Sequence, residues 1–243
     1  MSQKIYKNVP IVEAACEVVF DQSSQINADY ADQIYELIKN RYPEKKVVTN
    51  YLPLIETSSH GIEKRVTPHE KIQFYNENDS KHIRISQNVL SISQLAPYTS
   101  WNEFLENINN SIDTYRSVVQ PESILRVTLK YVNKIDFSKA MNEEGSIQFE
   151  SYFNIYPHLG EALPQQVNSF FLNLEFPIDD NSLAIHFTDL GVHILFELKF
   201  NNGKDDVNFD NLMDWLNLAH DHIENVFEGS ITDKTRKLMS EEE

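Results

Sequence analysis

The side chains best suited to binding chemistry lie in one stretch near the middle of the chain, residues 124–137, with the sequence ILRVTLKYVNKIDF. Arg126 and Lys130 offer positive charge, and Tyr131 and Asn133 offer hydrogen-bonding groups within an otherwise apolar row. A buried amide must be hydrogen-bonded, so Asn133 either fixes a bulge or a neighbouring loop or lines a polar pocket with Tyr131. The second alternative predicts a ligand pocket formed by Arg126, Lys130, Tyr131 and Asn133, which would take a small molecule or a nucleotide.

A second group of candidate residues is acidic and lies late in the chain. The net charge of the whole chain is −16, and residues 140–232 hold two lysines against 16 acidic residues, a local net charge of −14. This charge would repel a phosphate backbone, which argues against direct nucleic-acid binding. It predicts either a self-repelling, solvated surface or a docking face for a basic protein partner. The candidate docking residues are Asp205, Asp206, Asp210 and Asp214.

Other kinds of chemistry find little support in the sequence. The chain contains no GxGxxG, GxxxxGKS/T, GxSxG, HExxH or CxxC motif, which argues against the common phosphate-binding loops and serine hydrolases. Among the eight histidines, the best metal-binding candidates are His186 and His193 with Glu197, or His220 with Glu224. Solvent-facing or hydrogen-bonded histidines explain these positions as well. We therefore expect no catalytic residue, no metal ion and no cofactor.

Two stretches are predicted to be strands, because residues 124–137 and residues 10–20 both alternate between polar and apolar with a period of two. The apolar row of the earlier stretch contains the only cysteine, Cys16, which excludes an internal disulfide and which we interpret as a buried thiol. If the two strands pair, four charged residues come face to face. They are Glu13 and Glu17 on the earlier strand and Arg126 and Lys130 on the later one.

Hydrophobic periodicity predicts two long amphipathic helices, residues 100–119 and 210–228, each preceded by two short strands. Ser100 opens the first of them with a capping box. The order strand, turn, strand, helix thus occurs in residues 82–115 and again in residues 183–227. This repetition predicts an α+β fold, with a largely antiparallel sheet built from a pseudo-duplicated unit. The arrangement resembles TATA-binding-protein-like folds, and a helix-grip fold of the START type is the alternative.

No glycine-, serine- or proline-rich linker divides the chain, so we expect one domain over residues 1–232, with pseudo-repeat halves 1–121 and 122–232. Residues 233–243 are predicted to be a polar tail, and residues 58–70 an irregular loop. The longest apolar runs are three or four residues, far short of the roughly 20 that a membrane span requires. The first residues do not resemble a signal peptide. We therefore expect a soluble cytoplasmic protein.

Three short segments resemble the landmarks of a protein family. They are PIVEAACEVVF at residues 10–20, LKYVNKIDF at 129–137 and FEGSITD at 227–233. Together they look like an uncharacterised, sporadically distributed bacterial family of similar length, whose middle strand carries an Arg-Tyr-x-Asn-like motif. In this chain Lys130 stands where that arginine would be, so a role that depends on a bidentate guanidinium does not carry over. The patchy occurrence of the family resembles that of defence and toxin–antitoxin genes, which implies a partner-binding role.

Charge asymmetry and the missing catalytic motifs predict a non-enzymatic, cytosolic protein-binding or regulatory subunit of an antitoxin-like or phage-defence-associated kind. Its acidic C-terminal half would dock a basic partner encoded nearby. The alternative is a small-molecule or nucleotide-binding protein, or an enzyme, with a pocket near Tyr131 and Asn133. A homo-oligomeric scaffold is the third hypothesis, and it depends on a sheet face being left uncovered.

Overall fold

We describe the chain from a computed structural model. It describes residues 6–24, 26–58, 61–141, 147–156, 160–163, 170–203 and 207–240, and within these ranges it leaves out the side chains of residues 24, 28, 50–58 and 61–70.

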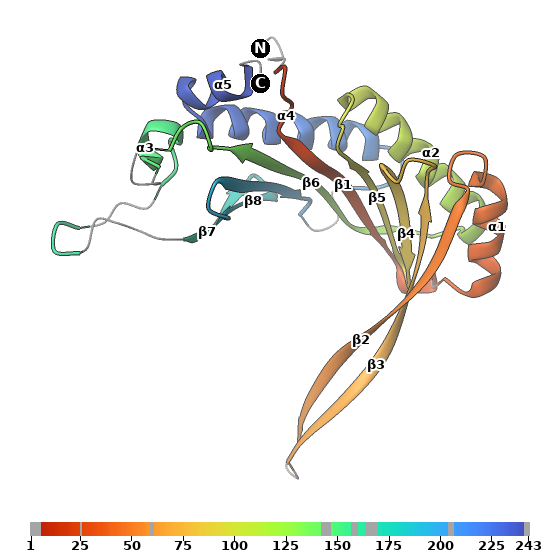
Figure 1. Ribbon diagram of the computed structural model, residues 1–243. Coiled ribbons are helices and arrows are strands. Elements are labelled where there is room, and N and C mark those ends of the chain that lie inside the picture. Colours follow the sequence, from red (N-terminus) through yellow and green to blue (C-terminus); the bar gives the residue numbers. More distant parts are fainter. Residues whose placement is uncertain are drawn as a thin grey trace.

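The described part of the chain is built on a nine-stranded sheet in which every neighbouring pair of strands is antiparallel. The strand order is β2-β3-β4-β5-β1-β6-β9-β8-β7. The strands are β1 Ile11–Phe20, β2 Glu44–Ser58, β3 Gly61–Tyr75, β4 Lys81–Ser86, β5 Val89–Leu95, β6 Ile124–Asp136, β7 Phe171–Ile178, β8 Asn181–Asp189 and β9 His193–Asn201. With the helices, this sheet confirms the predicted α+β fold with a large antiparallel sheet (Figure 1).

The strand order is nearly symmetric about the central pair formed by β1 and β6. The β4–β5 hairpin flanks β1, and the β8–β9 hairpin flanks β6. Each hairpin is followed in sequence by a long helix, α2 Trp101–Val119 or α4 Leu212–Ser230. This strand order is consistent with a pseudo-duplicated strand-turn-strand-helix unit.

The long helices and α1, Ala28–Ile38, all cover the same face of the sheet (Figure 1). Side chains cap two of these helices as the sequence indicates: Asn27 accepts from the backbone N–H of Tyr30, and Ser100 accepts from that of Glu103. α2 ends at Gln120, whose φ of 55° is left-handed. The helices cover only one face because each strand alternates, presenting apolar residues to them and polar residues to the other side.

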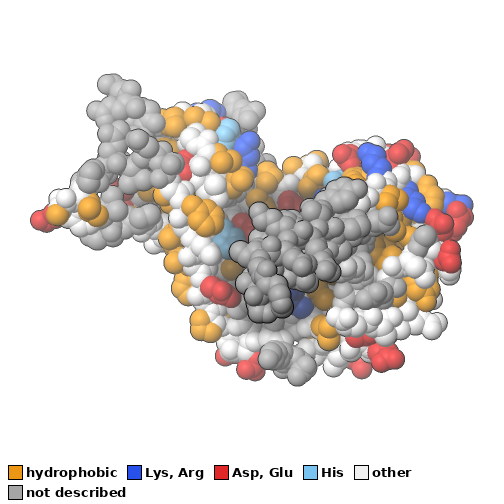
Figure 2. All heavy atoms as spheres, turned by 90° about the horizontal axis from the view of Figure 1, so that it is seen from below, with side chains coloured by type: hydrophobic (Ala, Val, Ile, Leu, Met, Phe, Trp, Pro, Cys, Tyr) orange, Lys and Arg blue, Asp and Glu red, His pale blue; other side chains and the backbone are white. Residues whose placement is uncertain are grey.

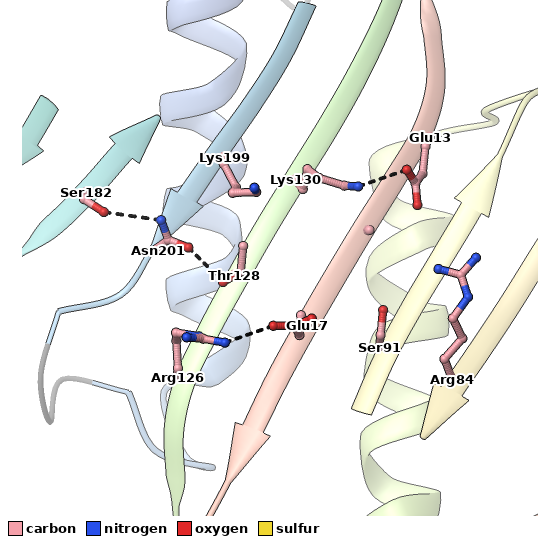
Figure 3. Close-up of a pocket in the computed structure, with 11 residues that line it drawn as sticks. Glu13, Glu17, Arg84, Ser91, Arg126, Thr128, Lys130, Ser182, Lys199 and Asn201 are labelled. Carbon is pink, nitrogen blue, oxygen red and sulfur yellow. Dashed lines mark hydrogen bonds and ion pairs between the residues drawn. The ribbon is translucent and has the colours of Figure 1, made fainter. Parts of the chain in front are cut away.

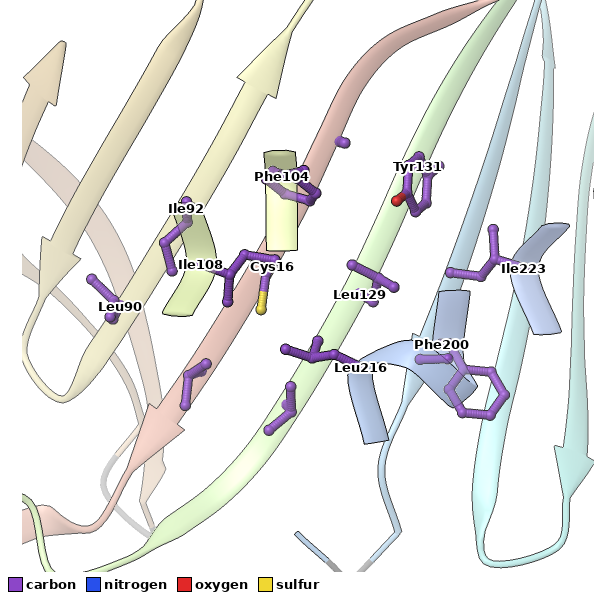
Figure 4. Close-up of a cluster of buried hydrophobic side chains, with 14 of the residues drawn as sticks. Cys16, Leu90, Ile92, Phe104, Ile108, Leu129, Tyr131, Phe200, Leu216 and Ile223 are labelled. Atoms are coloured by element: carbon purple, nitrogen blue, oxygen red, sulfur yellow. The ribbon is translucent and has the colours of Figure 1, made fainter. Parts of the chain in front are cut away.

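The hydrophobic core fills the space between the helices and the sheet. Figure 4 shows its centre, where Cys16 and Leu129 of the central strands lie among side chains of α2 and α4. Both residues are fully buried. Burial raises the pKa of the Cys16 thiol, so the thiol stays protonated, as expected of a core residue rather than a nucleophile.

Two segments differ from the sequence prediction. Residues 58–70 were expected to form a loop, yet residues 61–70 belong to β3, which pairs with β2 along its whole length. The backbone hydrogen bonds to β2 make this segment a strand, and its polar composition does not reveal that pairing.

The predicted polar tail contains α5, Asp233–Ser240, which buries Thr235 and Met239. The Thr235 hydroxyl donates to the backbone carbonyl of Tyr152 in the short helix α3, Phe149–Tyr152, so α5 is anchored to the rest of the fold.

The remaining helical element is the 3₁₀ turn η1, Gln22–Ser24, which follows β1. Among the helices of the described ranges, none is both long enough and apolar enough to cross a membrane.

Truncating the centre of the core should be costly. Leu129→Ala is expected to lower the free energy of unfolding by about 2–5 kcal/mol, because Leu129 is fully buried between both long helices and the sheet. Leu125→Ala on the same strand is the matched control, since Leu125 is 53% exposed, and it should change stability by no more than about 0.5 kcal/mol. Urea unfolding followed by circular dichroism measures both. Equal losses for the two variants would contradict the burial of Leu129 in the core.

Candidate functional sites on the two faces of the sheet

The four residues predicted to form one ligand pocket lie on opposite faces of the sheet. Because side chains alternate along β6, Arg126 and Lys130 point away from the helices, whereas Tyr131 and Asn133 point toward them. The structure therefore does not bring the four together. Instead it places two of them in each of two separate pockets.

The first pocket, which we call the polar-face pocket, lies on the face that the helices leave uncovered. Its volume is about 660 Å³, and its charged lining consists of Glu13, Glu17, Arg84, Arg126, Lys130 and Lys199. These side chains come from β1, β4, β6 and β9 and project to the same side of the sheet (Figure 3). Figure 2 shows the molecule from that side, with charged side chains of both signs exposed on it.

Cross-strand ion pairs organise the polar-face pocket. The Nζ of Lys130 lies 2.9 Å from Oε2 of Glu13, and a guanidinium nitrogen of Arg126 lies 3.2 Å from Oε1 of Glu17. Both pairs confirm the predicted juxtaposition of β1 and β6. Since these groups are partly solvated, each pair contributes roughly 1 kcal/mol or less to stability.

Glu197 of β9 extends this ionic network. Its Oε1 lies 3.2 Å from the Nζ of Lys199 and 2.9 Å from Nδ1 of His186. Burial acts to raise the pKa of the Glu197 carboxyl, but Lys199 and His186 outweigh burial and hold that pKa below its ordinary value. Glu197 is therefore ionised at neutral pH and is engaged by its neighbours.

The second pocket, which we call the aromatic pocket, lies on the helix side and has a volume of about 550 Å³. Residues 98–102, the inner rows of β6 and β9, residues 9–11 and the second half of α4 surround it. Its characteristic residues are Tyr98, Trp101, Tyr131, His220, Asp221 and Glu224. Pockets with mostly apolar walls and a few convergent polar groups are the usual form of ligand sites.

A chain of hydrogen bonds crosses the floor of the aromatic pocket. The hydroxyls of Tyr98 and Tyr131 lie 3.2 Å apart, and the Tyr131 hydroxyl lies 3.2 Å from Nδ1 of His220. Burial raises the pKa of Tyr98 to about 12 and lowers the pKa of His220 to about 4. At neutral pH the phenols are protonated and the imidazole is neutral, so this floor carries no charge.

Trp101 forms one wall of the pocket by stacking on the His220 ring. The ring centroids are 4.3 Å apart and the ring planes differ by 7°. The indole N–H donates to Oδ1 of Asn217, one turn earlier on α4, at 2.9 Å. The Trp101 side chain is thus held against α4 by stacking and by a hydrogen bond, and it stays only half-buried.

Asn133 lies in the wall of the aromatic pocket, and its amide bonds to the neighbouring strand β9 rather than to a loop. Its side-chain amide donates to the backbone carbonyl of Phe196 at 3.2 Å, and the residue lines the aromatic pocket. The β1–β6 register shifts between Ile11 and Glu13, directly opposite this part of β6. The amide therefore joins β6 to β9 at the place where pairing with β1 is irregular.

Acidic residues form a stripe along α4. Asp214, Asp221, Glu224 and Glu228 share one helical face, and the last three line the aromatic pocket. Burial first, and then the charges of Asp221 and Glu228, raise the pKa of the Glu224 carboxyl. Glu228 is neutralised in part by Arg236, whose Nε lies 3.0 Å away. No described lysine or arginine forms an ion pair with Asp221 or Glu224.

The predicted docking residues only partly coincide with this stripe. Asp210 and Asp214 are exposed at the start of α4, and Asp205 and Asp206 lie outside the described residues. Sequence reasoning named Glu224 only as a metal-ligand candidate and missed Asp221 and Glu228, although the seven-residue spacing of Asp214, Asp221 and Glu228 places them on one helical face. The segment that carries Tyr98 and Trp101 lies across the pocket from that face. It is distant from α4 in sequence, and no sequence pattern indicated that the two would meet.

In the part of the chain that the structure describes, no three His, Cys, Asp or Glu side chains are grouped so as to hold a metal ion. His186 lies beside Glu197, while His193 lies 3.9 Å from Asp136 instead.

Comparisons with known proteins assign no family. No family model matches the chain, and no curated protein sequence matches it. Among solved structures, the Pct1 RNA triphosphatase of S. pombe, determined in complex with the Spt5 CTD, is 11% identical and aligns over 98% of this chain and 88% of that chain. The TM-score is 0.14, which is too low to establish a common fold.

Burial of His220 should make stability depend on pH. Between about pH 6.5 and pH 4 the unfolded chain binds a proton at this histidine and the folded chain does not, so stability should fall as pH decreases through that range. The test is to measure the urea concentration at the midpoint of unfolding at pH 7 and at pH 5, for the unmodified protein and for His220→Gln. The midpoint should fall less between pH 7 and pH 5 in the variant than in the unmodified protein.

His222→Gln on the same helix is the control, because it leaves His220 in place. If His220→Gln and the unmodified protein show the same pH dependence, His220 is not held neutral by the pocket.

Proposed function

We propose that this chain is a binding protein that takes the basic side chains of a protein partner into the aromatic pocket and along the acidic stripe of α4. One observation carries the proposal: three carboxylates and two aromatic walls converge on a pocket whose described lining contains no lysine or arginine. A protonated amine or a guanidinium is the group that such a lining recognises, through ion pairing and through cation–π contact with Trp101.

The electrostatics of the pocket support this choice. Glu228 lies in the last turn of α4, where the negative end of the helix dipole disfavours carboxylates. Burial and the two neighbouring carboxylates Asp221 and Glu228 disfavour the charged form of Glu224 and raise its pKa. A bound cation would relieve this repulsion. The pocket is therefore strained in its free state and complementary to a positive group.

The length of the stripe favours a protein segment over a small amine. From Asp214 to Glu228 the helix advances by roughly 20 Å, at about 1.5 Å per residue. Asp214 and Asp210 are exposed beyond the pocket, where they could meet further basic residues of an extended partner. The overall charge of −16 would accelerate encounter with such a partner. A regulatory, antitoxin-like or defence-associated role, as the family resemblance implies, requires a contact of this kind.

A fluorescent peptide rich in lysine and arginine is the direct probe. We expect its anisotropy to rise on titration with the full chain, and the affinity to fall as salt is added, because exposed charges are screened. Competition with spermidine distinguishes a basic protein segment from a small amine as the ligand. If spermidine displaces the labelled peptide only weakly, a peptide-length partner is supported. If it displaces the labelled peptide as strongly as unlabelled peptide does, a small amine is favoured. An uncharged peptide of the same length that binds equally well would overturn the proposal.

Glu224→Gln provides a test in which stability and binding change in opposite directions. At pH 7 the variant should be more stable than the unmodified protein, because it removes a carboxylate that the fold disfavours. Below about pH 4, where carboxyl groups are protonated, the difference should vanish. The same variant should bind the basic peptide more weakly. Thermal unfolding at the two pH values and anisotropy titration measure these effects.

Glu106→Gln is the matched control, because Glu106 is an exposed helical glutamate outside the pocket. It removes the same charge from the chain and should change neither stability nor peptide binding appreciably. If both variants weaken binding equally, only the net charge matters and the pocket has no specific role.

A further inference from the structure

We infer that the polar-face pocket is a second binding site, for a small ligand that carries at least two linked phosphate groups. The site lies on the opposite face of the sheet from the aromatic pocket and has the opposite charge preference, so the inference does not rest on the proposed function. Its lining holds four cations, Arg84, Arg126, Lys130 and Lys199, against the two carboxylates Glu13 and Glu17.

The concentration of cations in this pocket contrasts with the rest of the chain. The chain carries 21 lysines and arginines against 37 acidic residues, yet cations outnumber carboxylates in this lining. The strand order brings the cations together: β4, β1, β6 and β9 lie within five consecutive strands, and each contributes side chains to the same face (Figure 3). An anion is the complementary ligand for such a surface.

The register places two of these cations directly opposite each other. Lys130 on β6 pairs with Lys199 on β9, and their side chains lie on the same face. Like charges at directly opposed positions destabilise an antiparallel pair. Glu13 pairs with Lys130 and Glu197 pairs with Lys199, so each lysine is offset by one carboxylate. A phosphate group bound between the two ammonium groups would remove the repulsion.

Arg84 supplies an unused donor on the other side of the pocket. Its Nε is buried and has no hydrogen-bond partner among the described residues, and one terminal nitrogen lies 3.2 Å from Nδ1 of His82. The guanidinium is planar and presents paired N–H donors, which suit phosphate oxygens. The contact with His82 involves one terminal nitrogen, so the guanidinium keeps further N–H donors at the pocket.

The spacing of the cations indicates more than one phosphate. β4 and β6 are three strands apart in the sheet, a separation of roughly 14 Å at about 4.8 Å per strand. A chain of linked phosphates spans this width and fits within 660 Å³, so it can contact both Arg84 and the lysine pair. Hydroxyl groups of Ser91, Thr128 and Ser182 add neutral hydrogen-bonding groups to the lining. Side chains on strands thus perform the task that glycine-rich loops perform elsewhere.

Calorimetric titration of the full chain with sodium tripolyphosphate tests the inference, alongside orthophosphate and ATP. We expect tripolyphosphate to bind and orthophosphate to bind at least about tenfold more weakly, because only the longer anion reaches both groups of cations. Binding of ATP as tight as that of tripolyphosphate would identify a nucleotide as a ligand of this class. No binding of tripolyphosphate, or equal binding of sulfate at matched ionic strength, would overturn the inference.

Lys199→Gln should weaken tripolyphosphate binding by about tenfold or more, because the variant removes one of the two opposed lysines. Arg84→Gln is the second variant, with the same expected direction of effect. Lys39→Gln is the control, since Lys39 is an exposed lysine at the C-terminal cap of α1. Equal losses for Lys199→Gln and Lys39→Gln would show that binding follows net charge alone.

Glu224→Gln, in the aromatic pocket, should leave tripolyphosphate binding unchanged. If the basic peptide does not bind, the tripolyphosphate experiment still tests the polar-face pocket, and the converse also holds.

Discussion

The antiparallel pairing of β1 with β6 is the constraint on which the rest of this structure depends. Cys16 lies opposite Leu129 and Ala14 opposite Tyr131, so the apolar rows of the two strands face the helices together. Because side chains alternate, the same register places the polar rows together on the other face. A slip of one residue would bury charged groups beneath the helices. The core thus fixes the register, and the register forms both pockets.

The two pockets show how one strand can serve two kinds of chemistry. Lys130 and Tyr131 are adjacent in sequence, yet one lines a pocket rich in cations and the other lines a pocket bordered by carboxylates. The sheet separates these opposite charges by the thickness of its backbone and its apolar row. Each pocket has its own electrostatic potential, because different elements carry the charged residues. Strands carry those of the polar face, and α4 carries those of the helical face.

The sequence was sufficient for those features that depend on local pattern. Period-two alternation located β1 and β6 and indicated that, if they pair, Glu13 and Glu17 face Arg126 and Lys130, whereas the individual pairs come from the structure. Helix caps and apolar stripes located α2 and most of α4. The grouping of Arg126, Lys130, Tyr131 and Asn133 into one pocket did not take account of the same alternation, which sends neighbouring residues to opposite faces. Chemical suitability and proximity in sequence do not determine a shared site on a strand.

Features that arise from contacts between distant segments could not be predicted. The stacking of Trp101 on His220 joins residues more than a hundred positions apart, and no local signal relates them. The β3 segment after Gly61 is polar, and only its hydrogen bonds to β2 define it as a strand. α5 is short and strongly polar, and it is held by contacts such as that of Thr235 with α3. In each case tertiary contacts decide the structure, and local propensity is a weak guide.

The single cysteine gives this fold a built-in reporter. Cys16 is fully buried beneath α2 at the central strand pair, and its thiol is held in the unreactive protonated form. A thiol-specific reagent can reach this sulfur only when the helices separate from the sheet or the whole chain unfolds. The rate of labelling therefore measures how often the middle of the molecule opens, with no engineered probe and no competing thiol elsewhere in the sequence.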